Sequence, residues 1–404
     1  MRAREGLKLA AAAAVMMGSI STARAQQPAE PATREAAIEQ AQSEKSQNLR
    51  PYEISKGERL MGKVDSILNG TVRKWHPFFE SAYSGGGFTL GAGYAQYLSP
   101  FNVLDVRASY SAANYKLAEA EFIAPRLFHR RGALSVVGGW REATQVPFYG
   151  IGTDTPNVTR FTFGFQRPYA SALLTLRPTR RYLMLRGGLE LTQWKEQRGQ
   201  GSSPVDSGFT PVALPGIGID VTYVHSQGTV GFDWRNSPGY ARRGGFYGVT
   251  VHDYSDRDNA FGFRQYDYEA IQHFPILREA WVISLHGLAS TTSTSKGQLI
   301  PYFMLPALGS GHTLRGFDSF RFRDRNRLMV QAEWRIMVNR FMDTAFFYDA
   351  GKVTRSTADL DFQGLKSDFG FGARFHSPFT TPLRVEVAKS NEGLRFVLNT
   401  SHVF

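Results

Sequence analysis

Residues 368–375 read Asp368-Phe369-Gly370-Phe371-Gly372-Ala373-Arg374-Phe375. Apolar residues take every second position, and aspartate, glycine and arginine take the positions between them. Because successive side chains of a β-strand point to opposite faces, this stretch predicts a strand with one apolar and one polar face. A soluble β-sandwich would rarely place three phenylalanines opposite charged side chains. A transmembrane β-strand needs this pattern, with apolar side chains toward lipid and polar ones toward a wet lumen.

The same alternation continues through Leu383 to Ala388 and Leu394 to Ser401, and breaks at Gly, Pro and Arg clusters divide the chain into sixteen such segments. They begin near Pro77, Phe88, Asn102, Tyr115, Ala133, Thr159, Arg181, Ile217, Gly244, Ala260, Ala280, Arg327, Thr344, Lys366, Leu383 and Leu394. Backbone groups in lipid cannot stay unpaired, so the sheet must close on itself. We therefore predict an all-β fold, a closed 16-stranded antiparallel transmembrane β-barrel over 77–404 with a short N-terminal helical lead-in.

An even number of strands places both chain ends on one side of the membrane, which is the periplasm in this class of barrel. The long connections, 146–158, 197–216, 295–326 and 354–365, all follow odd-numbered segments and would therefore lie outside. Five of the seven periplasmic turns carry arginine, namely Arg130-Arg131, Arg180-Arg181, Arg242-Arg243, Arg278 and Arg340. These guanidinium groups could bind inner-leaflet phosphates or an acidic periplasmic partner, or simply be solvated.

The composition narrows the class of protein. Aromatic residues make up 13% of the chain, which is too many for a disordered protein, and no apolar run reaches the roughly 18 residues of a transmembrane helix. Cysteine is absent, so the chain has no disulfide and no thiolate metal site. No G-x-S-x-G, H-E-x-x-H or P-loop motif occurs, and the histidines lack metal-ligand spacing. We expect no enzyme activity, no metal, no cofactor and no nucleic-acid partner.

The N-terminus has the features of an export signal. Residues 1–25 contain basic Arg2, Arg4 and Lys8, an apolar stretch, and the small-x-small cleavage site Ala23-Arg24-Ala25. An uncleaved helical anchor is the alternative, although the apolar run is short for one. Residues 26–76 are predicted to form a periplasmic linker, or exposed helix, and then a short amphipathic helix. That helix starts at the capping box of Ser55 and Glu58 and ends at Asn69-Gly70, and it would pack on the barrel mouth or dock a partner or plug.

One connection stands out, the loop Gly309-Ser310-Gly311-His312-Thr313-Leu314-Arg315-Gly316-Phe317. Gly311 and Gly316 would let the chain turn sharply, and Phe317 would wedge against the barrel wall. Strand alternation places Leu328, Val330 and Trp334 outward, so that Glu333 points inward, and the same reasoning points Asp349 inward. Two inward carboxylates on adjacent strands make a fork for one guanidinium, which we assign to Arg315. The cluster would either fix the loop as a constriction or take part in gating or substrate passage.

Several motifs resemble the BamA/TamA outer-membrane superfamily, also called bacterial surface antigens. They are Leu314-Arg315-Gly316-Phe317, the strand Phe347-Tyr348-Asp349-Ala350-Gly351 and the terminal Phe404, with Phe148 to Gly152 and Arg321 to Asn326 resembling smaller members. The resemblance implies a barrel whose sixth external loop folds into the lumen, with Arg315 at its tip and Glu333 and Asp349 as its wall partners. It also implies a weak seam between 77–84 and 394–404, and a role for Phe404 in targeting the barrel to its assembly machinery.

Larger members of that superfamily carry periplasmic POTRA modules, which this sequence does not show, so it resembles a small member. The resemblance implies a protein integral to the outer membrane of a Gram-negative cell, in contact with outer-membrane lipid. It would insert or translocate protein or lipid, with a separate periplasmic or lipoprotein partner. The alternative is a passive porin-like channel for small solutes, which would leave the arginine loop unexplained.

Overall fold

The structure is a computed structural model that describes residues 33–47, 59, 74–179, 182–201, 203–377 and 380–400. Two compact units, 1–55 and 56–404, make up the chain. The first unit contains the helix α1 (Arg34–Gln47), most of which is exposed, so the described part of the predicted linker or exposed helix is an exposed helix. Within the described ranges, no helix combines the length and hydropathy needed to cross a membrane. The predicted signal peptide, Phe404 and all of the helix expected over 55–69 except Arg59, which is helical, lie outside the described residues.

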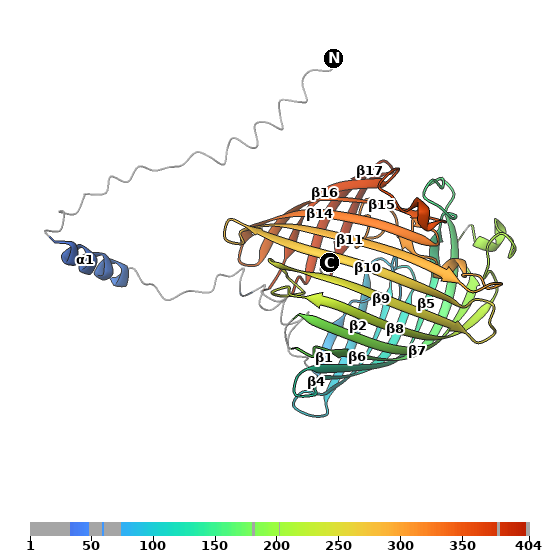
Figure 1. The fold of residues 1–404 in the computed structure, drawn as a ribbon, viewed down its shortest axis with the longest axis horizontal. Helices are drawn as coiled ribbons and strands as arrows, with labels where there is room; N and C mark the ends of the chain where they lie inside the picture. Colours follow the sequence, from blue (N-terminus) through green and yellow to red (C-terminus); the bar gives the residue numbers. More distant parts are fainter. Residues whose placement is uncertain are drawn as a thin grey trace, which may run out of the picture. The chain divides into compact units, whose positions relative to one another are not determined.

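The second unit is built on one antiparallel sheet of sixteen strands, each paired with its neighbour in chain order (Figure 1). The strands of its first half are β1 (Trp75–Phe78), β2 (Thr89–Tyr97), β3 (Val103–Ser111), β4 (Lys116–Leu127), β5 (Gly132–Phe148), β6 (Phe161–Leu176), β7 (Leu183–Arg198) and β8 (Asp220–Asp233). Those of its second half are β9 (Gly244–Asp256), β10 (Phe263–Ile276), β11 (Trp281–Thr294), β14 (Asn326–Asn339), β15 (Met342–Thr354), β16 (Lys366–Phe375), β17 (Leu383–Ser390) and β18 (Gly393–Asn399).

The connections contain short elements of their own. They are the 3-10 turns η2 (Val205–Ser207), η3 (Tyr302–Met304) and η4 (Thr357–Asp359), and the hairpin of β12 (Ala307–Leu308) with β13 (Phe322–Arg323). Both halves of that hairpin lie in the long connection between β11 and β14, which is the connection that carries the arginine loop.

The expected strands are confirmed in number, order and direction. The largest difference between an expected and an observed start is three residues, at β8, which begins at Asp220 rather than Ile217, and at β10, which begins at Phe263 rather than Ala260. The long connections follow odd-numbered strands, as the spacing predicts. Alternation set by burial and polarity therefore specifies this sheet well, because every strand has two chemically different faces.

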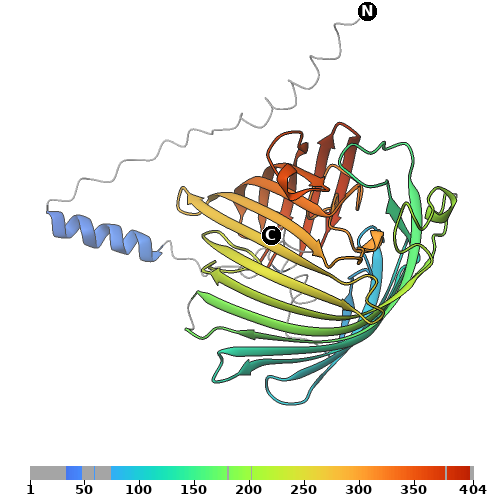
Figure 2. The same ribbon diagram turned by 45° about the vertical axis from the view of Figure 1, so that its right-hand side comes forward.

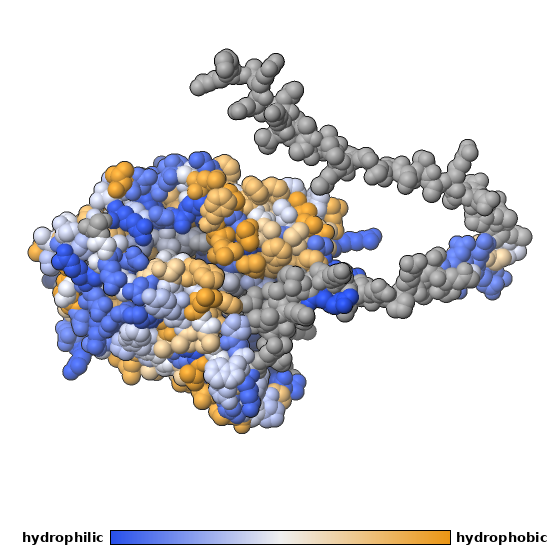
Figure 3. All heavy atoms as spheres, turned by 180° about the vertical axis from the view of Figure 1, so that it is seen from behind, coloured by the Kyte–Doolittle hydropathy of each residue, from blue (hydrophilic) through white to orange (hydrophobic). Residues whose placement is uncertain are grey.

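The two faces of the sheet differ as the alternation predicts. On β16, Phe369 and Phe371 are 61% and 56% exposed, whereas Asp368 before them and Arg374 after them are buried. Apolar side chains cover much of the middle of the wall visible in Figure 3, and hydrophilic ones gather toward one end. The outward face therefore has the chemistry of a lipid-facing surface, and the inward face holds the charges.

The sheet is strongly curved, and the connection between β11 and β14 lies against its inner face (Figure 2). β1 and β18 stand at the two ends of the strand order. The connection contacts β18 itself, through the ion pair of Asp318 with Arg395, and the segment that follows β1, where Phe320 stacks on Tyr83 with ring centroids 4.8 Å apart. One inner segment thus links the first and last edges of the sheet.

Aromatic side chains fill the space between that connection and the strands β5 to β7. Tyr302 of η3 is fully buried and packs edge-to-face on Phe148 and Phe163, with centroid distances of 5.4 and 4.9 Å. Phe303 stacks on Trp194 at 5.6 Å. Aromatic packing therefore seats the η3 part of the connection on β5–β7, whereas the part that carries Arg315 meets charged side chains of β14–β17.

Candidate functional site: the buried arginine of the inner connection

Apolar contacts seat the arginine loop on the sheet. Leu314 and Phe317 are almost completely buried and form one cluster with Leu308 and Phe322 of the β12–β13 hairpin. On the sheet side this cluster rests on Met329 and Val353 and is contacted by Leu288. Burying a leucine and a phenylalanine contributes about 1.5–3 kcal/mol each, so the loop is held in place by packing before any charge is considered.

Glycines allow the loop to turn and to lie this close to the strands. Gly311 and Gly316 lie in the turns predicted there, which are closed by the N–H of Thr313 donating to the carbonyl of Ser310 at 3.3 Å and the N–H of Phe317 donating to that of Leu314 at 3.2 Å. The left-handed backbone conformation occurs at Gly309, with φ of 101°. Gly316 also serves close approach, because a Cβ there would lie 2.5 Å from Cβ of Asp368. Gly351 does the same from the sheet side, since a Cβ there would meet Leu308 at 2.9 Å.

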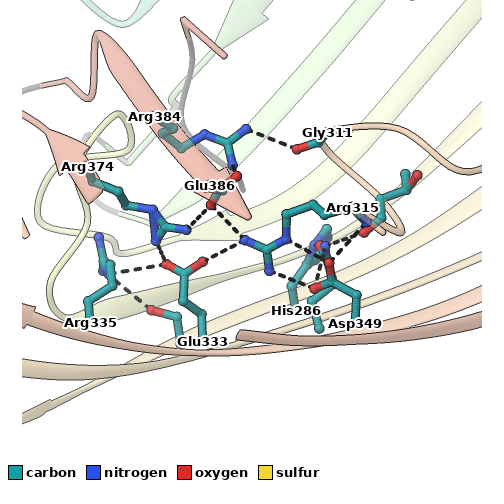
Figure 4. A network of polar contacts seen from close by, with 12 residues as sticks. His286, Gly311, Arg315, Glu333, Arg335, Asp349, Arg374, Arg384 and Glu386 are labelled. Carbon is teal, nitrogen blue, oxygen red and sulfur yellow. Dashed lines mark hydrogen bonds and ion pairs between the residues drawn. The ribbon is translucent and has the colours of Figure 1, made fainter. Parts of the chain in front are cut away.

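The structure brings Arg315 together with both carboxylates assigned to it (Figure 4). Its Nε and Nη2 donate to the two oxygens of Asp349 at 2.7 Å each, which is a bidentate pair, and its Nη1 donates to Glu333 at 3.2 Å. The side chain is 0% exposed. Charge-assisted bidentate pairs of this kind are the strongest side-chain hydrogen bonds in proteins, and they also fix orientation.

The aromatic ring of Phe347 also contacts the guanidinium of Arg315. The Cζ atom of Arg315 lies 3.4 Å from the centroid of that ring, within the range of a cation–π contact. Burial alone would lower the pKa of Arg315, but the carboxylates of Asp349 and Glu386 outweigh it and raise that pKa above its ordinary value. The arginine therefore stays charged, and the loop tip is a fixed positive charge.

Further charged side chains extend the cluster over four adjacent strands. Glu386 of β17 accepts from Arg315 at 3.1 Å, from Arg374 at 2.6 Å and from Arg384 at 2.8 Å. Arg374 of β16 also donates to Glu333, so it joins the two glutamates. Arg384 reaches back to the loop and donates to the carbonyl of Gly311 at 3.1 Å. Loop and wall therefore share one continuous ionic network.

Sequence reasoning did not assign Glu386, Arg374 and Arg384 to this site, although a signal for them was present. Each occupies an inward position of the alternating pattern in its strand, as Glu333 and Asp349 do. Listing every inward charge on the strands neighbouring β14 and β15 would have found them. Their separation from Arg315 along the sequence, however, does not indicate that they would pair with it.

Asp368 is the one poorly satisfied carboxylate of this cluster among the described residues. It faces Asp349 across the β15–β16 ladder and is 1% exposed. Neither of its oxygens makes a hydrogen bond of good geometry, although Asp349 and the Gly316 backbone N–H lie near it. Two carboxylates side by side in a buried place repel each other when both are ionised, and a proton held between Asp368 and Asp349 removes that repulsion.

The outer part of the connection is tied to a second loop. Arg321 donates to Thr155 at 2.7 Å and forms an ion pair with Glu392 at 2.7 Å, while Tyr149 donates to Asp318 at 2.6 Å. The N–H of Gly152 donates to the carbonyl of Arg323 at 2.8 Å. The runs 148–152 and 321–326, which resemble the same family in the sequence, therefore meet in space.

Nothing in this arrangement suggests a metal centre. In the ranges that the structure describes, no three or more His, Asp or Glu side chains are grouped so as to hold a metal ion. The network is made of arginine–carboxylate pairs, whose chemistry is structural and electrostatic. What the arrangement can do is hold a loop in one position and release it if the pairs are broken.

A family model confirms the relationship that the motifs indicate. The model of the Omp85 superfamily domain matches residues 102–402. The chain belongs to the Omp85 superfamily. Omp85 barrels are outer-membrane proteins of Gram-negative bacteria with roles in assembly and transport, and the chain is accordingly an outer-membrane protein of that kind. The motif-based expectation of the BamA/TamA group is thus confirmed at the level of the superfamily.

Solved structures share the fold at low identity. BamA from Haemophilus ducreyi lacking POTRA domains 1–3 matches with a TM-score of 0.58 and 15% identity, over 78% of this Omp85 chain and 67% of that one. CdiB from Acinetobacter baumannii matches with a TM-score of 0.49 and 12% identity, over 82% of this chain and 58% of that one. No curated protein sequence matches the chain. At such identities the likeness to BamA concerns the fold alone.

The carboxylates that flank the β15–β16 ladder give a first prediction. Asp349→Asn leaves the buried charge of Arg315 without its bidentate partner and should lower the free energy of unfolding by about 3–5 kcal/mol. Asp368→Asn is the matched control at the facing position, and it should leave that free energy equal or higher, because an amide can donate to Asp349. Urea unfolding in detergent micelles, followed by tryptophan fluorescence, measures both. Equal losses in the two variants would contradict the assignment of Arg315 to Asp349.

The glycines of the loop give a second prediction. Gly316→Ala places a methyl group 2.5 Å from Cβ of Asp368, where neither main chain can move freely, and overpacking of this kind costs about 1–3 kcal/mol. Gly311→Ala is the control, since its methyl group would meet the flexible amide of Asn399 at 2.8 Å. The unfolding midpoint should fall for Gly316→Ala and change little for Gly311→Ala. A larger loss in the control would show that the loop tip is not packed as described.

Proposed function

We propose that this protein is a closed sixteen-stranded outer-membrane barrel that inserts or translocates polypeptide or lipid, with a separate periplasmic or lipoprotein partner. In this proposal the arginine loop lies inside the lumen and is clamped to the wall by Asp349, Glu333 and Glu386. Both ends of the barrel domain face the periplasm, because the number of strands is even. The observation that carries the proposal is the fully buried ion-pair network of Arg315.

Closure of the barrel is supported by the environment of the two edge strands. In a membrane, an unpaired strand edge facing lipid costs several kcal/mol for each unsatisfied backbone group. β1 is four residues long and β18 is seven, so any pairing between them is short. The inner connection contacts both edges, through Tyr83 on one side and Arg395 on the other. A short seam, braced from inside by a loop, is the part of the wall that opens most easily.

The chemistry of the clamp favours a movable part over a permanent plug. A plug that never moves needs no buried charges, since apolar side chains of similar size often give equal or greater stability than a buried ion pair. The Arg315 network instead fixes one position of the loop. Any other position would leave buried charges without their partners, which costs the free energy of desolvating them. Such an element has two states, clamped and released, and the passage of a substrate or the binding of a partner can shift it between them.

An inner chamber beside the loop supports passage. Its volume is about 510 Å³, and it lies between strands β5–β10 and the segment 303–307. Its wall combines charged Arg167 and Glu190 with aromatic Trp194 and Tyr254. A mixed polar and aromatic lining suits an extended polypeptide or a lipid headgroup with its chain. The same polar lining also suits the second candidate function, a passive channel for small solutes, which gives the arginine clamp no role.

The clamp gives the third prediction. Arg315→Ala removes the hydrogen bonds of the guanidinium to Asp349, Glu333 and Glu386, and it should raise the open probability, or the current fluctuations, of the protein in planar lipid bilayers. Arg264→Ala is the control, because the ion pair of Arg264 with Asp253 is exposed at both ends. Single-channel recording at matched salt measures both variants. Currents of Arg315→Ala that cannot be told from the unmodified protein would rule out a clamped constriction.

The partner is tested separately. Affinity capture of the unmodified protein from cross-linked outer membranes, with mass spectrometry, should recover a periplasmic protein or a lipoprotein at a fixed ratio. An equally abundant porin captured in the same way is the control. Capture of no such partner, together with steady solute conductance, would favour the passive channel.

A further inference from the structure

The turn between β8 and β9 is folded as a small separate loop rather than a simple hairpin turn. Its neck is closed by Asn236, whose side-chain oxygen accepts from the N–H of Arg242 at 3.0 Å and of Arg243 at 3.3 Å, and whose own N–H donates to the carbonyl of Arg243 at 3.2 Å. Beyond that neck the tip, residues 237–241, projects away from its two strands. We call residues 236–243 the inward turn.

The tip of the inward turn pairs with the far side of the sheet. Gly239 forms a backbone bridge with Thr380, in the connection between β16 and β17, and the hydroxyl of Thr381 donates to the carbonyl of Gly239 at 3.2 Å. β8 and β16 are separated in the strand order by β9, β10, β11, β14 and β15. The inward turn therefore crosses the mouth of the curved sheet at the end where β8 stops and β9 starts.

Tyr240 is the main contact at the tip. It is 5% exposed, and its hydroxyl donates to Asp343 of β15 at 2.7 Å and lies 3.0 Å from Nε2 of His376. Its ring stacks on the imidazole of His376, with centroids 3.8 Å apart and planes at 12°. Because both the ring and the hydroxyl of Tyr240 have partners in the far wall, this side chain holds the tip in place. Its removal would leave a polar pocket.

Arginines from both sides complete the attachment. Arg335 of β14 donates to the carbonyl of Ala241, and its guanidinium lies 5.6 Å from the centre of the Tyr240 ring. Arg242 donates to the carbonyl of Glu279 in the turn between β10 and β11. Of the arginine turns noted in the sequence, this one therefore uses its first guanidinium for contacts within the protein, to Tyr240 and Glu279.

The inward turn lies directly against the Arg315 network. Between them is a cavity of about 20 Å³, lined on one side by Gly239 and Tyr240 and on the other by Glu333, Arg374 and Arg384. A space of that size holds about one water molecule. Both the arginine loop and the inward turn therefore lie against the charged side chains of β14, β16 and β17.

We propose that the inward turn is a displaceable plug that closes the β14–β17 side of the lumen at the end opposite the long loops. Its tip is attached by what we call the latch, the contacts of Tyr240 with Asp343 and His376 and of Gly239 with Thr380 and Thr381. Its neck is closed by its own hydrogen bonds. The tip can therefore leave the far wall without breaking the ladder between β8 and β9. Release opens a route along the Arg315 network, and the inference rests on the proposed passage of substrate through the lumen.

A reversible cross-link tests the plug directly. The chain has no cysteine, so Gly239→Cys with Thr380→Cys creates the one possible disulfide. Paired backbones lie about 5 Å apart, which is within the Cα separation that a disulfide spans. In planar bilayers the oxidised protein should show about a tenfold lower open probability than the same protein after reduction. Equal currents before and after reduction, with the cross-link verified by mass spectrometry, would overturn the proposal.

The latch is tested by a subtle substitution. Tyr240→Phe keeps the ring stack on His376 but removes the hydroxyl and its bond to Asp343. Losing about one net hydrogen bond should raise the open probability about tenfold. Tyr223→Phe is the matched control, because the hydroxyl of this buried tyrosine bonds the carbonyl of Phe261 at the other end of the sheet. An unchanged open probability in Tyr240→Phe, or an equal rise in the control, would contradict the latch.

The two sets of experiments separate the two ideas. If Arg315→Ala changes the currents while the cross-link and Tyr240→Phe do not, the plug is wrong and the lumen route stands. If none of these variants changes the currents, the lumen route itself fails, and the plug fails with it. If the cross-link alone acts, the plug is supported and the clamp is not.

Discussion

A buried positive charge must be neutralised, and the inner architecture of this protein depends on how Arg315 meets that requirement. Its guanidinium is out of contact with solvent and is matched by Asp349, Glu333 and Glu386, which come from three different strands. These strands must keep one register for the oxygens to converge, and the loop must keep one path for the arginine to reach them. Wall register and loop position are therefore set by one interaction.

Much of the fold follows from local chemistry and was predictable. Alternation of large apolar and polar residues marked all sixteen strands, because each strand faces two different environments. The inward direction of Glu333 and Asp349 followed from the outward positions of Leu328 and Trp334, since a period of two leaves no other choice. Whatever is dictated by the residue and its immediate neighbours in the strand could be inferred from the sequence.

What could not be predicted depends on contacts between distant parts of the chain. The third carboxylate, Glu386, lies 71 residues from Arg315, and nothing local indicates that they meet. The turns at Gly311 and Gly316 were predictable, but the left-handed conformation of Gly309 and the close approach of Gly316 to Asp368 were not. The inward turn of Tyr240 looked like one more solvated arginine turn. In each case a tertiary contact decides the role, and the sequence shows only that the residue is suited to it.

The most direct measurement of the central claim is a double-mutant cycle on Arg315 and Asp349. Arg315→Leu, Asp349→Leu and the double variant would be unfolded in urea in the same detergent, and their free energies of unfolding compared with that of the unmodified protein. We expect a coupling of about 1–3 kcal/mol, with the double variant more stable than the sum of the two single losses would make it. Losses that simply add would show that Arg315 and Asp349 do not depend on each other, and would contradict the clamp.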